Sequence, residues 1–272
     1  LIYSVVDSNG NIVTFDKPPE RIVAFDSAAV ETLFAMGEGH RIIGTHSMVT
    51  YPPETKNITK VGDAFNMNIE ATVALEPDLV FIFFDTFLED LKKAGLKVLY
   101  LESLNNKFEK TTGNIRMWGQ IVGNVEAAEM SVIQFDAMVS SVKESIDSVE
   151  GSLRVFQDVG GLWTPGSNTL VGEVFSLLNL ENIAHDITGY AQLSPESIVD
   201  RNPHIIITSD PELIKGNPAF KNIIAVTEEK FISMPDALSI AGPRFAEGIQ
   251  ELMVLVYPNI FPPSNNAKSY SP

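Results

Sequence analysis

The chain contains no cysteine, so disulfide bridges, thiolate metal sites and a cysteine nucleophile are all excluded. Long apolar runs are also missing: none approaches the roughly 20 residues that a membrane-spanning helix needs, and we expect no direct membrane insertion. Cations are scarce, because 19 Lys and Arg residues stand against 35 Asp and Glu residues. The resulting net charge of −16 argues against binding nucleic acid or an anionic membrane through a basic surface.

The ends of the chain lack signals of their own. The first residue is Leu1 rather than Met, and no basic segment followed by an apolar one comes after it, so we expect a mature or trimmed form whose signal segment is absent. Residues 263–272 are polar and rich in Ser and Asn, and we expect a disordered tail there.

Motifs for catalysis and metal binding are missing too. No nucleophile elbow, phosphate-binding loop or dinucleotide-binding glycine pattern occurs. The four histidines show no metal-ligand spacing. His40 and His204 are predicted at the surface, and contact with a metal-bearing ligand is left open as an alternative for His46 and His185. We therefore predict no catalytic residue, no resident metal and no intrinsic cofactor.

A long amphipathic segment near the middle of the chain is the strongest positive signal. Over residues 124–151, apolar side chains recur at steps of three and four, and Gly151 is a plausible stop. The charged side chains fall largely off this stripe. The pattern predicts one helix on the order of 37 Å long, at 1.5 Å per residue.

Short apolar strands alternate with helices on both sides of this segment. Residues 1–18 read as a hairpin with a turn at Asn9-Gly10. The predicted strands that follow are residues 21–25, 41–44, 78–84 and 96–101 before the helix, and 153–159, 204–208 and 230–234 after it. Such alternation indicates parallel sheets covered by helices on both faces.

The pattern after the helix repeats the pattern before it. Glu70, Val73 and Pro77 precede one buried strand at the same spacing as Glu196, Val199 and Pro203 precede another. We predict an α/β fold with two pseudo-equivalent Rossmann-like lobes, each with a central parallel sheet, joined by one long backbone helix. The predicted boundaries are 1–123 for the first lobe, 124–151 for the helix and 152–262 for the second lobe.

Ligands of open parallel sheets bind at the carboxyl ends of the strands, where loops and helix N-termini meet. We therefore expect a cleft between the lobes. The candidate ligand-binding residues are Ser27, Tyr51, Phe65, Phe84, Asp85, Trp163, Thr164, Tyr190, Leu238 and Arg244. This set is rich in rings and poor in cations, and Trp163 is the strongest candidate because its loop contains glycine and proline. Each ring has packing against the core as its alternative role.

Several blocks of the chain resemble one protein family. RIVAFDSAAVETLFAMG, YPPETKNITKVGDAFNMNIEATVALEPDLVF, GGLWTPGSNTLVGEVFSLLNLENIA, LSPESIVDRNPHIIIT and AGPRFAEGIQEL occur in an order similar to that of the helical-backbone (type III) periplasmic substrate-binding proteins. These proteins serve ABC importers of cobalamin, haem and ferric siderophores. The resemblance spans residues 3 to 262.

The resemblance implies a location outside the cytoplasm, in the periplasm or anchored to the outer face of the membrane. We also expect a monomer. It implies a transported metal chelate, a ferric siderophore or cobalamin, that is passed to an ABC permease dimer. Glu70 and Glu196, near the N-termini of their short helices, are implied to dock on the permease. A haem-binding member, a sensory domain that has lost transport, and an enzyme on a two-lobed scaffold remain as alternatives.

Overall fold

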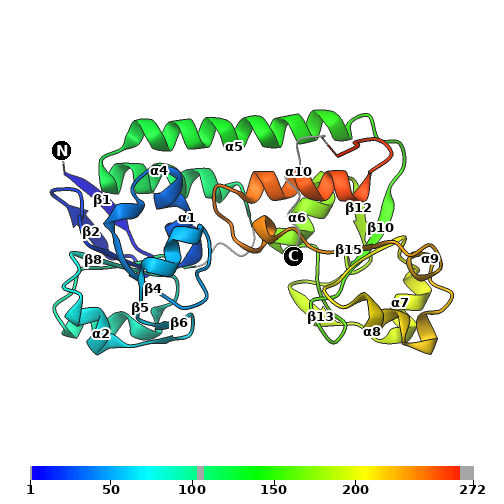
Figure 1. Ribbon diagram of the computed structural model, residues 1–272, viewed down its shortest axis with the longest axis horizontal. Helices are drawn as coiled ribbons and strands as arrows, with labels where there is room; N and C mark the ends of the chain where they lie inside the picture. Colours follow the sequence, from blue (N-terminus) through cyan, green and yellow to red (C-terminus); the bar gives the residue numbers. More distant parts are fainter. Residues whose placement is uncertain (1, 103–106, 264–272) are drawn as a thin grey trace. The chain divides into compact units, whose positions relative to one another are not determined.

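The computed structural model describes residues 2–102 and 107–263 (Figure 1). The chain forms two compact units, each with its own core. Within the described residues, unit 1 comprises 2–102, 109–135 and 240–244, and unit 2 comprises 107–108, 136–239 and 245–263. The predicted tail lies outside the described residues, apart from residue 263.

Unit 1 is built on a five-stranded parallel sheet in the order β5-β4-β3-β8-β9. The strands are β3 (Ile22–Phe25), β4 (Ile42–Thr45), β5 (Thr59–Lys60), β8 (Leu79–Ile82) and β9 (Val98–Tyr100). Every residue of β3 and β8 is buried, as expected for strands covered on both faces. The parallel arrangement predicted for this half is confirmed.

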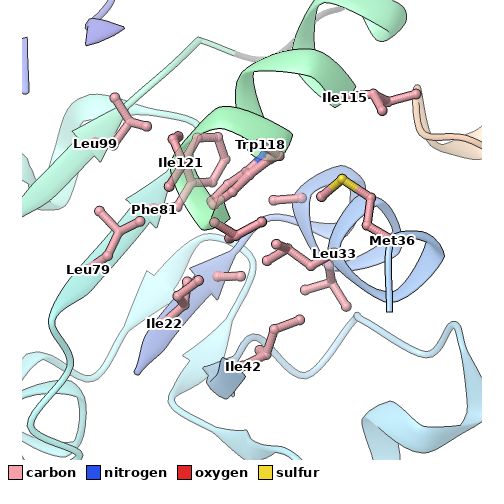
Figure 2. Close-up of a cluster of buried hydrophobic side chains, with 14 of the residues drawn as sticks. Ile22, Leu33, Met36, Ile42, Leu79, Phe81, Leu99, Ile115, Trp118 and Ile121 are labelled. Carbon is pink, nitrogen blue, oxygen red and sulfur yellow. The ribbon is translucent and has the colours of Figure 1, made fainter. Parts of the chain in front are cut away.

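One face of the unit 1 sheet carries a large apolar core, which Figure 2 shows in close-up. Ile22, Leu79 and Leu99 of the sheet face Leu33 of helix α1 (Ser27–Ala35) and Trp118 of helix α4 (Lys110–Val122) in this core. The alternate strand residues belong to a second core, to which helices α2 (Ile69–Ala74) and α3 (Leu88–Lys93) contribute. The sheet is therefore a middle layer between two layers of helices.

Short elements complete unit 1. Strands β1 (Tyr3–Val6) and β2 (Ile12–Phe15) form the predicted antiparallel hairpin, and Gly10 has the positive φ of 82° that its turn requires. The remaining elements are the ribbon β6 (Gly62–Asp63) and β7 (Asn66–Met67) and the 3₁₀ turns η1 (Gly39–Arg41), η2 (Pro53–Asn57) and η3 (Asp85–Phe87).

Unit 2 contains a four-stranded parallel sheet in the order β12-β10-β14-β15. Its strands are β10 (Leu153–Gln157), β12 (Leu180–Asn182), β14 (Ile205–Ile207) and β15 (Phe231–Ile232). Its helices are α6 (Leu170–Leu177), α7 (Pro195–Arg201), α8 (Pro211–Lys215), α9 (Ile224–Thr227) and α10 (Phe245–Val256). The ribbon β11 (Trp163–Pro165) with β13 (Tyr190–Gln192) and the turns η4 (Pro218–Phe220) and η5 (Asp236–Ser239) complete it.

The predicted central helix exists as α5 (Val125–Ile146), and its two halves belong to different units. It ends five residues before the predicted stop at Gly151, because the chain turns at Asp147 and Ser148. Helix α4, which precedes α5, was not predicted. Its sequence contains Gly113 and Gly119, which lower intrinsic helix propensity and hide the helical pattern.

The internal repeat is visible in how the short helices α2 and α7 begin. Asn68 caps α2 by accepting from the N–H of Ala71 at 2.9 Å, and Ser194 caps α7 by accepting from the N–H of Ser197 at 3.2 Å. Each cap satisfies a backbone donor that the helix itself cannot pair. The repeat that the sequence predicts therefore holds at the level of individual hydrogen bonds.

The same two helices end in the same way. The Arg21 guanidinium donates to the carbonyls of the last residues around α2, Leu75 and Glu76. The Arg154 guanidinium donates to the corresponding carbonyls around α7, those of Arg201 and Asn202, at 3.1 and 3.0 Å. An arginine thus neutralises the negative end of each helix from the start of the central strand.

His204 also takes part in this repeat. Its Nδ1 accepts from the backbone N–H of Arg154 at 2.9 Å, just as Asp78 Oδ1 accepts from that of Arg21 at 2.9 Å. Burial, and next the neighbouring Arg154 charge, lower the pKa of His204, which favours the neutral, accepting ring. His204, predicted at the surface, is half-buried there and hydrogen-bonded to the backbone of Arg154.

Candidate functional site: exposed rings at the strand ends

In unit 1, the segments after β3, β4 and β8 lie at the carboxyl ends of parallel strands. Asp26 follows β3 and caps α1 by accepting from the N–H of Ala29 at 2.8 Å. Burial raises the pKa of Asp26 to about 6. Ser27, a predicted contact, is the half-buried first residue of α1. These residues place a helix N-terminus at this end of the sheet.

Phe65 is a highly exposed ring of unit 1, with 70% of its surface accessible. Its turn is held by Asp63, whose Oδ1 accepts from the N–H groups of Phe65 and Asn66, each at 2.9 Å. The ring stacks at 6.5 Å from that of Phe84, which is half-buried against Phe83. Asp85, the next residue, begins η3 and is exposed. Phe65 and Phe84, two of the predicted contacts, therefore lie against one another.

Tyr51 and Arg244, two other predicted contacts, lie directly against one another. The Arg244 guanidinium carbon is 3.4 Å from the centre of the Tyr51 ring, a cation–π contact. Glu31 of α1 holds the same guanidinium through two hydrogen bonds, of 2.8 and 3.2 Å. The Glu31 side chain is 3% exposed, and its carboxylate balances the Arg244 charge.

His46, which follows β4, is buried at 3% exposure, and its ring packs 5.2 Å from that of Phe25. Its Nδ1 has no hydrogen-bond partner among the described residues. Burial lowers the pKa of His46 to about 4, with the Lys60 charge adding to the effect and Asp63 opposing it. The ring is therefore neutral at physiological pH and is packed in the protein rather than presented to a ligand.

In unit 2, the turn that follows β10 presents Trp163, which is 46% exposed. Asp158 fixes this turn, because its Oδ1 accepts from the N–H groups of Gly160 and Leu162, each at 2.9 Å. Two backbone bonds within the turn, between Val159 and Trp163 and between Trp163 and Gly160, close it further. Thr164, the neighbouring predicted contact, has its side chain buried in β11 instead.

Tyr190 begins β13 and is 55% exposed. The residue before it, Gly189, donates to the Asn168 side chain at 2.6 Å and accepts from the N–H of Gly166 at 2.7 Å. Tyr190 borders a cavity of about 520 Å³ in unit 2, which Leu238 of η5 also lines although its side chain is 4% exposed. Two predicted contacts therefore meet at this cavity.

Sequence reasoning missed several residues that shape these sites. Glu31 and Asp158 are buried acids that hold Arg244 and the Trp163 turn, and Gln157 lines the unit 2 cavity. A charged residue inside the apolar stretch around Glu31 was the one available signal; the other two follow from tertiary packing alone. The predicted docking residues, Glu70 and Glu196, are both exposed in the first turns of α2 and α7.

Among the described residues, no group of three or more metal-binding side chains comes together. Within those same ranges, every helix is too short or too polar to span a bilayer.

Each unit has a parallel sheet with helices around it, and the long helix α5 belongs to both units. This is the fold expected for the helical-backbone binding proteins. The chain belongs to the periplasmic binding protein family, whose sequence pattern matches residues 22–238. The predicted fold class and family are both confirmed.

Individual relatives cover most of the chain. An uncharacterized ABC transporter substrate-binding lipoprotein of Bacillus subtilis is 29% identical over 95% of this chain and 86% of its own length. A cobalamin-binding protein of Halobacterium salinarum is 29% identical over 74% of this chain and 57% of its own length. The crystal structure of a possible iron-binding (periplasmic solute-binding) protein from Staphylococcus epidermidis has a TM-score of 0.78 at 27% identity, covering 89% of this chain and 100% of that one.

Proposed function

We propose that this protein is the substrate-binding component of an ABC importer and that its cargo is a corrinoid of the cobalamin class. It works outside the cytoplasm and has no enzymatic activity. Membership of the periplasmic binding protein family and similarity to an ABC transporter substrate-binding lipoprotein support the transport role. Similarity to a cobalamin-binding protein supports the choice of cargo.

The observation that carries the proposal is the set of large rings exposed on fixed turns. Phe65, Trp163 and Tyr190 leave about half or more of their surfaces accessible, yet hydrogen bonds to their own turns hold them in place. Exposing such rings in water is unfavourable, and within each unit contact with an apolar ligand surface would remove them from water. Because the turns are already ordered, binding costs little further conformational entropy.

Charge favours a corrinoid over a strongly anionic chelate. The Glu31 carboxylate already balances Arg244, the one predicted cationic contact. The chain as a whole carries a net charge of −16, which repels anions at long range. An iron chelate remains the second candidate because of the similarity to a possible iron-binding protein, and a neutral ferric hydroxamate would fit better than an anionic ferric catecholate.

Calorimetric titration tests the proposal. The purified protein is titrated in parallel with cyanocobalamin, haemin, a neutral ferric hydroxamate and an anionic ferric catecholate. We expect saturable one-to-one binding of cyanocobalamin with a Kd of roughly 1 μM or tighter, equivalent to about 8 kcal/mol or more. If cyanocobalamin does not bind and another of these ligands binds tightly, the cargo is that ligand and not a corrinoid.

A further inference from the structure

Glu31 is a buried acid in an apolar helix. Its neighbours Val30 and Leu33 in α1 are fully buried, and its own side chain is 3% exposed. Hydrogen bonds of 2.8 and 3.2 Å join its carboxylate to the Arg244 guanidinium. Replacing a buried ion pair by well-packed apolar side chains is often neutral or stabilising, so stability alone does not account for an acid at this position.

The backbone just before Arg244 is shaped to fit this carboxylate. A Cβ at Gly242 would lie only 3.0 Å from Glu31 Oε2, so glycine allows the segment 240–244 to pack closely against the acid. The Gly242 N–H donates to the Ile240 carbonyl at 2.8 Å, which turns the segment tightly at this point. The pair of Glu31 and Arg244 is therefore built into the fold of unit 1.

The arginine of this pair also reaches the surface. The Arg244 side chain is 20% exposed, and its guanidinium carbon lies 3.4 Å from the centre of the Tyr51 ring, which is 42% exposed. The loop that carries this ring is held by Lys60, whose Nζ donates to the carbonyls of Val49 and Thr55 at 3.1 and 3.0 Å. Tyr51 and Arg244 thus form one ordered surface, the Tyr51–Arg244 surface, with the buried acid behind it.

We propose that Glu31 determines the charge selectivity of the Tyr51–Arg244 surface. By cancelling the Arg244 charge, the Glu31 carboxylate makes this surface suited to an uncharged part of the ligand and unsuited to a carboxylate or a catecholate. An arginine without that acid would instead pair with an anion through its planar set of donors. Glu31 is thus a specificity-determining residue that acts through Arg244 without touching the ligand.

The inference rests on the proposed function and names the charge that the site accepts. The side arms of corrinoids of the cobalamin class end in uncharged carboxamides, so hydrolysis of one arm to a carboxylate changes the charge of the ligand and hardly changes its shape. Cyanocobalamin and its monocarboxylic acid derivatives are therefore matched probes of charge selectivity.

Glu31→Gln tests the assignment, because glutamine keeps the size and a hydrogen-bond acceptor while removing the charge. Calorimetry measures the Kd of cyanocobalamin and of each monocarboxylic acid derivative, and their selectivity ratio is the Kd of the derivative divided by that of cyanocobalamin. We expect Glu31→Gln to lower this ratio about tenfold or more for at least one derivative, the effect of one hydrogen bond to a charged group. A ratio that stays the same for every derivative would overturn the assignment.

Glu54→Gln is the matched control. Glu54 is exposed and lies three positions after Tyr51, and either substitution removes one negative charge and moves the net charge from −16 to −15. The selectivity ratio of Glu54→Gln should equal that of the wild type. An equal fall in the two variants would show that overall charge sets the selectivity, and the assignment would be wrong.

Glu31→Gln combined with Arg244→Gln leaves no unbalanced charge in the fold, so it gives an answer where the single variant is unstable. If the paired arginine acts as an uncharged group, this double variant should keep the selectivity ratio of the wild type, although loss of the contact with Tyr51 weakens the binding of all these ligands. A tenfold rise in the ratio would show that Arg244 already attracts anions in the wild type, which would overturn the assignment.

Failure of the proposed function is a separate result. If the wild type binds cyanocobalamin and the ratios do not respond to Glu31→Gln, the proposed function stands and the role of Glu31 is wrong. If the wild type binds no corrinoid, the proposed cargo is wrong, and the same variants are compared with a neutral ferric hydroxamate and an anionic ferric catecholate. A catecholate-to-hydroxamate ratio of Kd values that falls only in Glu31→Gln would then support the role of Glu31, and equal ratios in all the proteins would overturn it.

Discussion

Phe65 and Trp163 reach solvent from turns that aspartate side chains hold in one shape. Asp63 accepts from two N–H groups at the first turn, and Asp158 accepts from two at the second. An aromatic side chain has only two rotatable bonds, so a ring on such a turn is ordered before any ligand arrives. Burying the ring against a ligand then yields affinity without the cost of ordering a loop.

The Trp163 ring should therefore contribute to binding and little to folding. Trp163→Ala should weaken ligand binding roughly ten- to hundredfold, corresponding to about 1–3 kcal/mol for a buried aromatic contact. The melting temperature without ligand should hardly change, because the side chain is 46% exposed. Calorimetry with cyanocobalamin and thermal unfolding measure the two effects.

Trp118, the other tryptophan of the chain, provides the matched control. It is 2% exposed in the unit 1 core, 5.1 Å from the ring of Phe81, and Trp118→Ala should cost about 3–5 kcal/mol of stability. A Trp163→Ala protein that is destabilised but binds normally would show that Trp163 belongs to the fold instead of the binding site.

His46 should make the stability of the protein depend on pH. Its folded-state pKa is lowered to about 4, so the unfolded chain binds more protons between pH 4 and about 6.5. Stability contributed by the neutral ring is fully present above pH 6.5 and is lost as the pH falls toward 4. The loss should approach 2–3 kcal/mol, about 1.4 kcal/mol per unit of pKa shift.

Chemical denaturation of the wild type and of His46→Phe between pH 4 and 7 measures this effect. The wild type should lose stability relative to the variant as the pH falls. Comparing the two proteins cancels the opposite effect of Asp26, whose raised pKa of about 6 stabilises the folded state on acidification. Parallel pH profiles for the two proteins would show that His46 becomes protonated in the folded state as easily as in the unfolded chain.

At the scale of secondary structure, the hairpin between α4 and α5 depends on one glycine. A Cβ on Gly119 would lie 2.4 Å from the Cβ of Ala128, closer than two carbon atoms can approach. Gly119→Ala should therefore destabilise the protein by about 1–2 kcal/mol, because the clash outweighs the higher helix propensity of alanine. The two helices run side by side at this point (Figure 1).

Two variants isolate the cause of that loss. Adding Ala128→Gly to Gly119→Ala should restore part of the stability, since it removes the other carbon atom of the clash. Gly113→Ala, at an exposed position of the same helix with no atom within 4 Å, should stabilise by up to about 1 kcal/mol. If urea unfolding shows that Gly119→Ala stabilises the protein as Gly113→Ala does, the two helices do not approach as closely as described.

These helices also show what the sequence could and could not reveal. Strands such as β8 and helices such as α5 were predictable because their apolar residues follow a period set by local geometry. Helix α4 was not predictable in this way. Its Gly119 is explained by the close contact with Ala128 in the folded protein, and no local sequence pattern indicates that contact. Boundaries differed by a few residues at most, as at the end of α5.

The candidate site was predictable to a similar extent. The exposed rings follow strand ends, where ligands of parallel sheets bind, so residues such as Phe65 and Trp163 were foreseeable. Their supports were not: Glu31 lies more than 200 positions from Arg244, and the burial of Gln157 beside the unit 2 cavity follows only from the folded structure. Polar contacts between residues far apart in the sequence leave no periodic pattern, so the sequence alone does not predict them.

At the scale of the whole molecule, the repeat extends from core to surface. Matching side chains cap the starts of α2 and α7, and an arginine binds the end of each. Glu70 and Glu196 occupy the first turns of these matched helices, and both are exposed. A carboxylate there gains roughly 0.3–1 kcal/mol from the helix dipole, which explains each glutamate but does not require one in both units.

The matched glutamates are expected to dock on the two permease subunits of the importer, one on each, with charge guiding the approach. Glu70→Lys with Glu196→Lys should abolish uptake of the cargo and co-purification with the permease, while calorimetry finds ligand affinity unchanged. Glu54→Lys with Glu181→Lys is the control, since both residues are exposed, one in each unit, and the net charge moves from −16 to −12 in either double variant. The control should still transport, because docking depends on the positions of the charges rather than on their sum. Normal uptake by the first double variant would leave Glu70 and Glu196 as ordinary helix-end residues, and equal loss of uptake in both variants would show that only overall charge matters.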